Sequence, residues 1–232
     1  YRQGQIKLKV GERRKALDFF KKALDIEPRS VTVLRAVVDL HEKQGDWEDV
    51  IHYRRALLAL DTDANERFTS LVTIGDILRE HLRNVPKAVE AYKEALVAQA
   101  DSRLVLGKLL DLYQEARQWN EAVEILTRLA ELERDLSRQS KYYYTIGVIQ
   151  RDELKDNFQA VRTLDKALDA DPGMLKAFQA IDQILTTERD YERQDRYYRK
   201  MLKRAMETKL DDKLVITLAK GLGEINRTRL KK

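Results

Sequence analysis

Three histidines are the side chains best suited to acid–base or metal chemistry, and they are scattered along the chain as His41, His52 and His81. Each stands alone on a different predicted element, with no His-rich metal-ligand spacing around it. Cysteine is absent, which excludes a thiolate metal site, a cysteine nucleophile and a disulfide scaffold. There is also no glycine-rich phosphate loop or nucleophile motif, and the pair Asp211-Asp212 is typical of a helix start. We therefore predict that the chain is not an enzyme and carries neither a metal nor a cofactor.

A different chemistry is indicated near the C-terminus, where basic residues are interleaved with Tyr197 and Tyr198. The basic residues are Arg193, Arg196, Arg199, Lys200, Lys203 and Arg204. Such a pattern can bind nucleic acid. However, Tyr198 falls on a core position of an internal repeat, and Asp190, Glu192 and Asp195 dilute the charge. RNA binding is therefore an alternative that we do not favour, and an acidic protein or an anionic membrane surface would suit the same residues.

The composition supports a folded, helix-rich chain of mixed charge. The 232 residues include only 9 Gly and 3 Pro, and 43% are hydrophobic, which is enough to form a core. The net charge is +5, and the excess lies at the C-terminus, where residues 189–232 hold 14 basic and 7 acidic residues. No run of about 18 apolar residues predicts a membrane span, and no signal peptide is visible. The compartment stays open, with the cytoplasm favoured.

An internal repeat with a period of 72 residues organises these elements. Ala16, Ala88 and Ala160 are followed by apolar residues four and seven positions later, which lie on one face of a helix. An interleaved series with the same period contains Trp47, Trp119 and Tyr191, and Ile74-Gly75 returns as Ile146-Gly147. A further copy, Leu222-Gly223, is displaced by four residues. The second helix of each unit is anchored at positions 16, 50, 88, 122, 160 and 194, so the spacing alternates between 34 and 38 residues.

In the first unit, residues characteristic of a known repeat follow one another without a gap. They are Gly4, Gly11, Ala16, Phe20, Ala23 and Pro28. This pattern, with a unit of about 34 residues, resembles the tetratricopeptide repeat family. The resemblance implies an all-α solenoid of helical hairpins wound as a right-handed superhelix. We predict one array over residues 1–232, expected to be a segment of a longer protein, with units at about 1–28, 29–62, 63–100, 101–134, 135–172 and 173–206 and a partial unit at 207–232.

Small and large residues alternate as close packing of helices requires. Gly75 and Gly147 on first helices supply notches, and large residues are expected to fill the space between successive units: Phe20, Tyr92, Leu164 and Tyr198. The aromatic series at Trp47 is interpreted as packing. The second helices are expected to begin at N-caps Asp46, Asn84, Asp156 and Asp190. Of the four extra residues of alternate units, one is expected in the turn inside the hairpin, and the rest are expected to lengthen the helices near residues 61–66 and 133–138.

The resemblance implies that the first helices line a concave surface that binds a partner. Its predicted contact residues are Arg35, Asp39, Asp76, Arg79, Lys108, Asp111, Tyr144, Arg151, Gln179 and Gln183. Among Tyr142-Tyr143-Tyr144, three consecutive residues cover about 300° of a helix, so at least one is expected to face outward. Tyr144 is the candidate hot spot. The chaperone-type carboxylate clamp of the family is rejected, because Asp39 and Asp76 would repel a carboxylate.

The function predicted from these features is a protein–protein interaction scaffold or adaptor. It would dock a peptide or helix of another protein in the groove, with charge complementarity setting specificity. A third alternative, besides RNA binding, is self-assembly by end-to-end stacking into a homo-oligomer or larger assembly, because neither end carries a polar capping helix.

Overall fold

The computed structural model describes residues 1–231, which form thirteen α-helices and one π-helix, with no strand in that range. The α-helices are α1 (Arg2–Lys9), α2 (Arg13–Ile26), α3 (Val31–Gln44), α4 (Trp47–Leu58), α5 (Ala64–Glu80), α6 (Val85–Ala98), α7 (Arg103–Glu115), α8 (Trp119–Leu132), α9 (Leu136–Asp152), α10 (Asn157–Ala170), α11 (Leu175–Glu188), α12 (Tyr191–Glu207) and α13 (Asp212–Glu224). The π-helix η1 (Ile225–Leu230) follows α13 directly. The predicted all-α class is confirmed.

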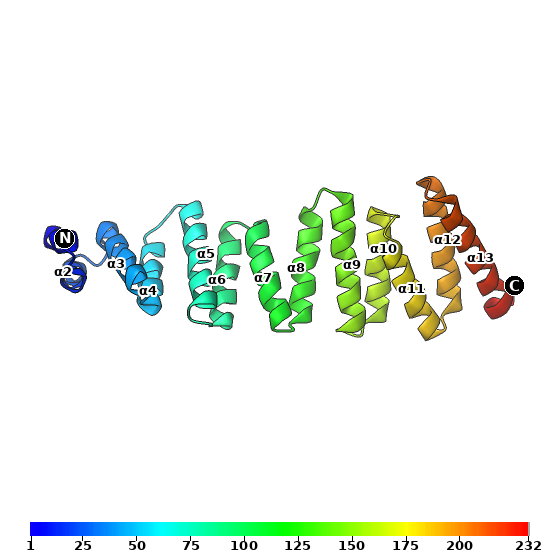
Figure 1. The fold of residues 1–232 in the computed structure, drawn as a ribbon, viewed down its shortest axis with the longest axis horizontal. Helices are drawn as coiled ribbons and strands as arrows, with labels where there is room; N and C mark the ends of the chain where they lie inside the picture. Colours follow the sequence, from blue (N-terminus) through cyan, green and yellow to red (C-terminus); the bar gives the residue numbers. More distant parts are fainter. Residues whose placement is uncertain (232) are drawn as a thin grey trace. The chain divides into compact units, whose positions relative to one another are not determined.

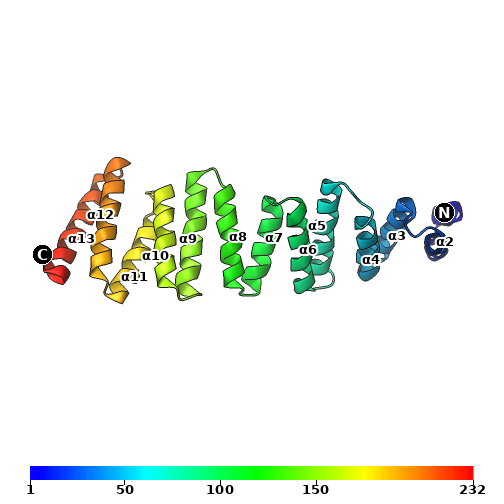
Figure 2. The ribbon, with the colours of Figure 1, turned by 180° about the vertical axis from the view of Figure 1, so that it is seen from behind.

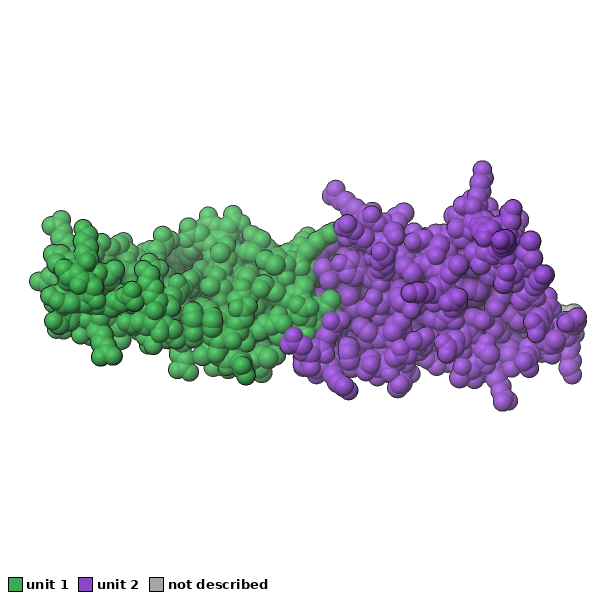
Figure 3. Space-filling model, in the orientation of Figure 1, with its two compact units in different colours: residues 1–112 green, residues 113–232 purple. Residues whose placement is uncertain are grey.

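Consecutive helices pack as hairpins inside two compact units, residues 1–112 and 113–232 (Figure 3). In the first unit the pairs are α1 with α2, α3 with α4 and α5 with α6; in the second, α9 packs on α10 and α11 on α12. Both ribbon views show α5 beside α6 and α9 beside α10 (Figures 1 and 2). No helix in residues 1–231 is both long and apolar enough to cross a membrane.

The helices of a hairpin approach closely where a glycine faces a large side chain. A Cβ on Gly4 would lie 2.5 Å from the Phe20 ring, and Gly75 faces the Tyr92 ring in the same way. Gly147 is equally close to Leu164. The predicted notches are therefore confirmed, and they receive the large residue of their own hairpin. Phe20 also belongs to one buried core cluster with Val33 and Val37 of the next hairpin, in agreement with its predicted place between successive units.

The last repeat departs from the predicted alignment. The glycine of α13 that meets a large side chain is Gly221, whose Cβ would lie 2.6 Å from the Tyr198 ring. Gly223, the glycine that the sequence aligned with Gly75, has nothing within 4 Å of the position that a Cβ would occupy. The displacement of four residues is retained further along the chain. In the earlier copy, His81 stacks on Trp47. Two periods later Tyr191 takes the place of Trp47, and Arg229, four residues beyond the position equivalent to His81, lies 5.4 Å from the centre of the Tyr191 ring.

Of the four N-caps predicted for second helices, three have a side chain that caps the helix. The side chains of Asn84, Asp156 and Asp190 each accept a hydrogen bond from a backbone N–H in the first turn of the following helix. Asp211 likewise caps α13 through the N–H of Lys213. Asp46 occupies the predicted N-cap position of α4, but its side chain makes no capping hydrogen bond. Its carboxylate is directed to His41 instead.

The alternation of 34 and 38 residues is explained by helix length. The first helices α5 and α9 each contain 17 residues, whereas α3 and α11 contain 14. The additional turn begins after the loop that ends at Asp63 and at Asp135, and each of these aspartates caps the longer helix. The expected lengthening near residues 61–66 and 133–138 is therefore confirmed.

Candidate functional site

Ion pairs join the first helices of the unit 1–112 along one face. Arg35 of α3 contacts Glu66 of α5 at 3.2 Å. Lys108 of α7 contacts Asp76 of α5 at 2.7 Å, and Arg79 lies 3.9 Å from Asp111. Five predicted contact residues thus lie on neighbouring first helices and pair there, four of them between α5 and α7. These pairs leave a surface on which positive and negative side chains alternate.

Asp76 has a structural role within that face. Its Oδ1 accepts a hydrogen bond from the Tyr92 hydroxyl at 2.5 Å and another from Lys108 Nζ at 2.7 Å. Burial of the ring, followed by the hydrogen bond to Asp76, raises the pKa of Tyr92 above its usual range. The Tyr92 hydroxyl is therefore a donor at any physiological pH, and the Asp76 carboxylate is already engaged on two sides.

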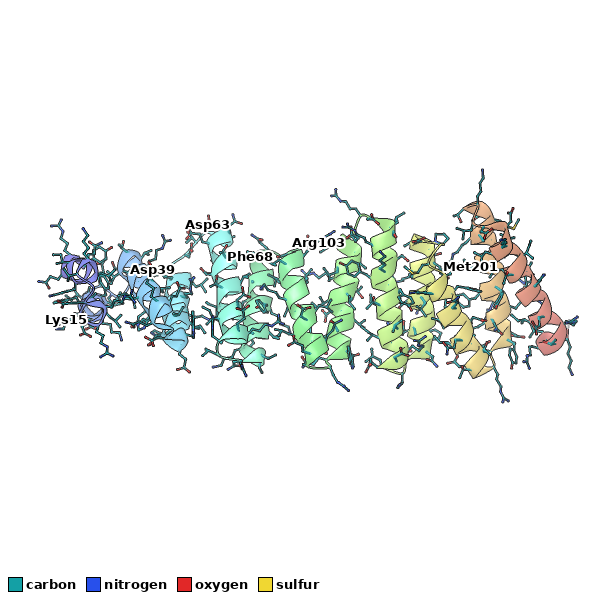
Figure 4. All side chains as sticks on the ribbon, viewed as in Figure 1. Lys15, Asp39, Asp63, Phe68, Arg103 and Met201 are labelled. Carbon is teal, nitrogen blue, oxygen red and sulfur yellow. The ribbon has the colours of Figure 1, made fainter. Side chains whose placement is uncertain are left out.

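Asp39, labelled in Figure 4, is exposed on α3 and lies between two recesses. The first, of about 340 Å³, is lined by Val31, Arg35, Val38, Asp39, Arg54, Leu57, Leu60, Asp61, Glu66 and Ser70. The second, of about 370 Å³, is lined by Tyr1, Gln5, Leu8, Lys9, Phe20, Ala36, Asp39, Leu40 and Lys43. The first recess is lined mainly by polar and charged side chains, the second mainly by apolar ones, and the exposed carboxylate of Asp39 lines both.

The charges around these recesses differ in how firmly they are held. Arg54 donates two hydrogen bonds to Glu42 Oε1, at 2.5 and 3.2 Å, and both side chains are partly buried. The Arg35 and Glu66 side chains are 62% and 58% exposed. An exposed pair contributes little to stability, about 0–1 kcal/mol, and can rearrange when a ligand arrives. Arg35 is therefore held less firmly than Arg54, and Asp39 is exposed beside it.

In the unit 113–232 the predicted contact residues differ from one another in exposure and in pairing. Gln179 and Gln183 are exposed on α11. Arg151 donates to its neighbour Asp152 at 2.6 and 2.8 Å, and this pairing lowers the pKa of Asp152. Tyr144 is half-buried and packs, with Tyr143, against the core formed by α10, α11 and α12. Only part of the Tyr144 ring is thus open to a partner.

The basic segment on α12 is largely neutralised by acids of the same unit. Arg204 is buried and pairs with Asp165 at 2.7 Å and with Asp169. Lys200 also contacts Asp165, at 2.6 Å. The other pairs are Arg193 with Glu188 and Asp190, Arg199 with Asp195, and Lys203 with Glu207. Five of the six predicted cations therefore meet carboxylates instead of forming an open positive surface.

A cluster at the turn between α3 and α4 was not predicted from the sequence. His41 is 2% exposed, and its Nδ1 lies 3.0 Å from Asp46 Oδ2 and 3.6 Å from Asp49 Oδ2. Among residues 1–231 this is the one group of three His, Cys, Asp or Glu side chains whose ligand atoms lie close enough to hold a metal ion. The expectation that each histidine stands alone is wrong for His41. The spacing of five and eight residues across a tight turn was the signal available in the sequence.

Comparison with known proteins identifies the repeat. Family profiles described as tetratricopeptide repeat match residues 105–140 and 1–30. A chain in the solved structure of Naa15/Naa10 bound to HypK-THB superposes with a TM-score of 0.54 at 18% identity, covering 97% of this chain and 34% of that chain. At this identity the likeness shows the fold alone, and the present chain spans only a third of that protein.

Two further solved structures are similar at lower scores. The C-terminal part of a TPR repeat-containing protein from Cytophaga hutchinsonii gives a TM-score of 0.42 at 13% identity, covering 99% of this chain and 96% of that chain. YrrB, described as a TPR protein with an unusual peptide-binding site, gives 0.41 at 18% identity, covering 76% of this chain and 87% of that chain. No curated protein matches the sequence.

Proposed function

Because the chain is a tetratricopeptide repeat protein, we propose that it is an interaction scaffold that docks a peptide or helix of a partner protein on its first-helix face. In the unit 1–112 the docking site comprises the two recesses on either side of Asp39. The observation that carries the proposal is the pair of recesses that share the exposed carboxylate of Asp39, one lined mainly by polar and charged side chains and the other mainly by apolar ones.

The chemistry of the recesses suits a short protein segment. Apolar side chains of a ligand would enter between Leu8, Phe20 and Leu40 on one side and between Val38 and Leu57 on the other. A basic residue of the ligand would meet Asp39, and an acidic residue would meet Arg35 after it leaves Glu66. Apolar anchors supply most of the affinity, and the charges select the partner and its direction.

The RNA alternative is less well supported. Non-specific affinity for nucleic acid depends on cations that are free to replace the counterions of phosphates. On α12 the guanidinium of Arg204 is buried between Asp165 and Asp169, and Lys200 shares Asp165. The acids of the same unit thus compete with phosphate for these side chains.

The family is also typically non-enzymatic, in agreement with the lack of a catalytic motif in the sequence.

The test is a pull-down from native lysate with the chain of residues 1–232, with and without nuclease, read by mass spectrometry. A charge-swap variant, Arg35→Glu with Asp39→Lys, serves as the second bait. A swap of the same kind on the exposed side of α2, Lys22→Glu with Asp25→Lys, is the matched control, because neither residue lines either recess.

A protein that survives nuclease, binds the control swap and is lost from the Arg35/Asp39 swap supports the proposal. Both variants should retain the circular dichroism spectrum and melting temperature of the natural chain, because all four side chains are exposed. Material that disappears with nuclease would favour RNA binding instead. A partner bound equally by both swaps would place docking elsewhere on the molecule.

A further inference from the structure

His41 is a buried polar side chain at a position where the repeat elsewhere holds other residue types. The equivalent positions one and two periods later are Tyr113 and Leu185, both buried. The His41 ring stacks on Tyr53, with the centroids 5.7 Å apart, and its Nε2 is buried without a hydrogen-bond partner. Its Nδ1 is directed at the carboxylates of Asp46 and Asp49. Within the described part of the chain, the polar contacts of the imidazole are therefore those of the cluster itself.

Asp46 gives up a capping role to join the cluster. Asn84, Asp156 and Asp190 begin their helices with side-chain caps, and such a cap contributes about 1 kcal/mol. Asp46 has the same position at the start of α4, yet its carboxylate faces His41 Nδ1 at 3.0 Å. Asp49 lies in the first turn of α4 and supplies the second carboxylate, at 3.6 Å.

The distances match a coordination sphere. The three ligand atoms all lie within 4.8 Å of one another. Metal–ligand bonds of about 2.0–2.2 Å in a tetrahedral site place ligand atoms about 3.3 Å apart. The two His41 distances, 3.0 and 3.6 Å, bracket that separation. The carboxylate side chains are 47% and 53% exposed, so an ion can enter from solvent and keep water as its remaining ligand.

We propose that His41, Asp46 and Asp49 form a binding site for one divalent transition-metal ion of the zinc class. An imidazole nitrogen favours zinc, cobalt or nickel over calcium and magnesium, which prefer all-oxygen sites. The two carboxylates balance the charge of the ion. The site would clamp the C-terminal end of α3 to the first turn of α4 and thereby brace the hairpin that carries Arg35 and Asp39.

The test is titration of the metal-free chain of residues 1–232 with zinc in a calorimeter, with cobalt absorption as a second probe. The expected result is one strong site per chain. His41→Leu, which introduces the residue found at position 185, and Asp49→Asn should each weaken zinc binding at least about 10-fold. Asp190→Asn is the matched control, because Asp190 has the equivalent N-cap position but caps α12 and pairs with Arg193. It should bind zinc like the natural chain.

An NMR measurement distinguishes zinc binding at this site from zinc binding at the exposed His52. In ¹⁵N-histidine spectra, zinc should shift the Nδ1 resonance of His41 and leave that of His52 in place. Asp49→Asn alters an exposed side chain, so it keeps the test valid even if His41→Leu fails to fold. Zinc binding of equal strength in Asp49→Asn, the lack of a strong site in the natural chain, or an unmoved His41 resonance would each overturn the proposal. Magnesium and calcium, titrated in parallel, should bind far more weakly.

Discussion

Gly147 of α9 lies so close to Leu164 of α10 that a Cβ on the glycine would be 2.6 Å from Leu164 Cγ. The same hypothetical atom would also lie 3.4 Å from the Ala160 carbonyl oxygen, which belongs to the backbone and cannot rotate away. The separation of the two helices is therefore set by the missing side chain of Gly147.

We expect Gly147→Leu to lower the free energy of unfolding by more than about 2 kcal/mol, because the added side chain has no space between the helices. The control is Gly223→Ala in α13, where nothing lies within 4 Å of the new Cβ. That change should be neutral or stabilise by up to about 1 kcal/mol, because alanine is the better helix former. Urea denaturation followed by circular dichroism measures both. Unchanged stability in Gly147→Leu would mean that the repeat register is wrong.

A second prediction concerns Asp76, which the sequence marks as a contact residue and the structure ties to Tyr92 and Lys108. Asp76→Ala should cost about 2 kcal/mol, because the buried Tyr92 hydroxyl loses its acceptor. Asp39→Ala, on the neighbouring first helix, removes an exposed carboxylate and should change stability by less than about 0.5 kcal/mol. Equal effects in the two unfolding curves would show that Asp76 is not a structural anchor.

The glycines and Asp76 also show how much of the fold and of the candidate site could be predicted from the sequence. The 72-residue period located the hairpins, the notches at Gly75 and Gly147 and the longer first helices, because helix packing depends on residue size at fixed positions. Periodicity also assigned Asp76 correctly to a first helix. It could not show which group Asp76 pairs with, because Lys108 lies 32 residues away and depends on how two hairpins stack.

The same limit applies to the charged and polar clusters. In the sequence, Arg204 belongs to a basic run; in the structure, it is buried against acids 39 and 35 residues earlier. Asp46 was predicted as a cap because aspartate favours that position, but His41 competes for its carboxylate. Ion pairs between distant residues and local competition of this kind are set by three-dimensional packing, which residue types alone do not specify.

A third prediction separates structural from available cations on α12. Arg204→Met should destabilise by about 2 kcal/mol, because Asp165 loses the charged hydrogen bond of its buried partner and keeps only Lys200. Lys203→Met changes a side chain that is 75% exposed and pairs with Glu207 at 3.7 Å, so stability should stay within about 0.5 kcal/mol. Thermal and urea unfolding compare them. If both variants were as stable as the natural chain, the cations of this segment would be free for a ligand.

The last prediction is a loss of stability at alkaline pH that depends on Tyr198. Burial, followed by the charge of Asp182 and a hydrogen bond to it, raises the pKa of Tyr198 to about 12. In the unfolded chain tyrosine ionises near pH 10, roughly its unperturbed value. The unfolded state therefore releases this proton first, and the associated stability, which is fully present below about pH 10, is lost as the pH rises toward about 12.

Tyr198→Phe cannot ionise, so the free energy of unfolding of this variant should fall less steeply between about pH 10 and pH 12 than that of the natural chain. Urea denaturation at several pH values across this range gives the two slopes, and groups other than Tyr198 cancel in the difference. Tyr191→Phe is the control, because it removes a tyrosine hydroxyl from the start of the same helix, outside the contact of Tyr198 with Gly221. An equal change of slope in both variants would mean that the effect is not specific to Tyr198. Parallel slopes for all three proteins would mean that the pKa of Tyr198 is not raised in the folded state.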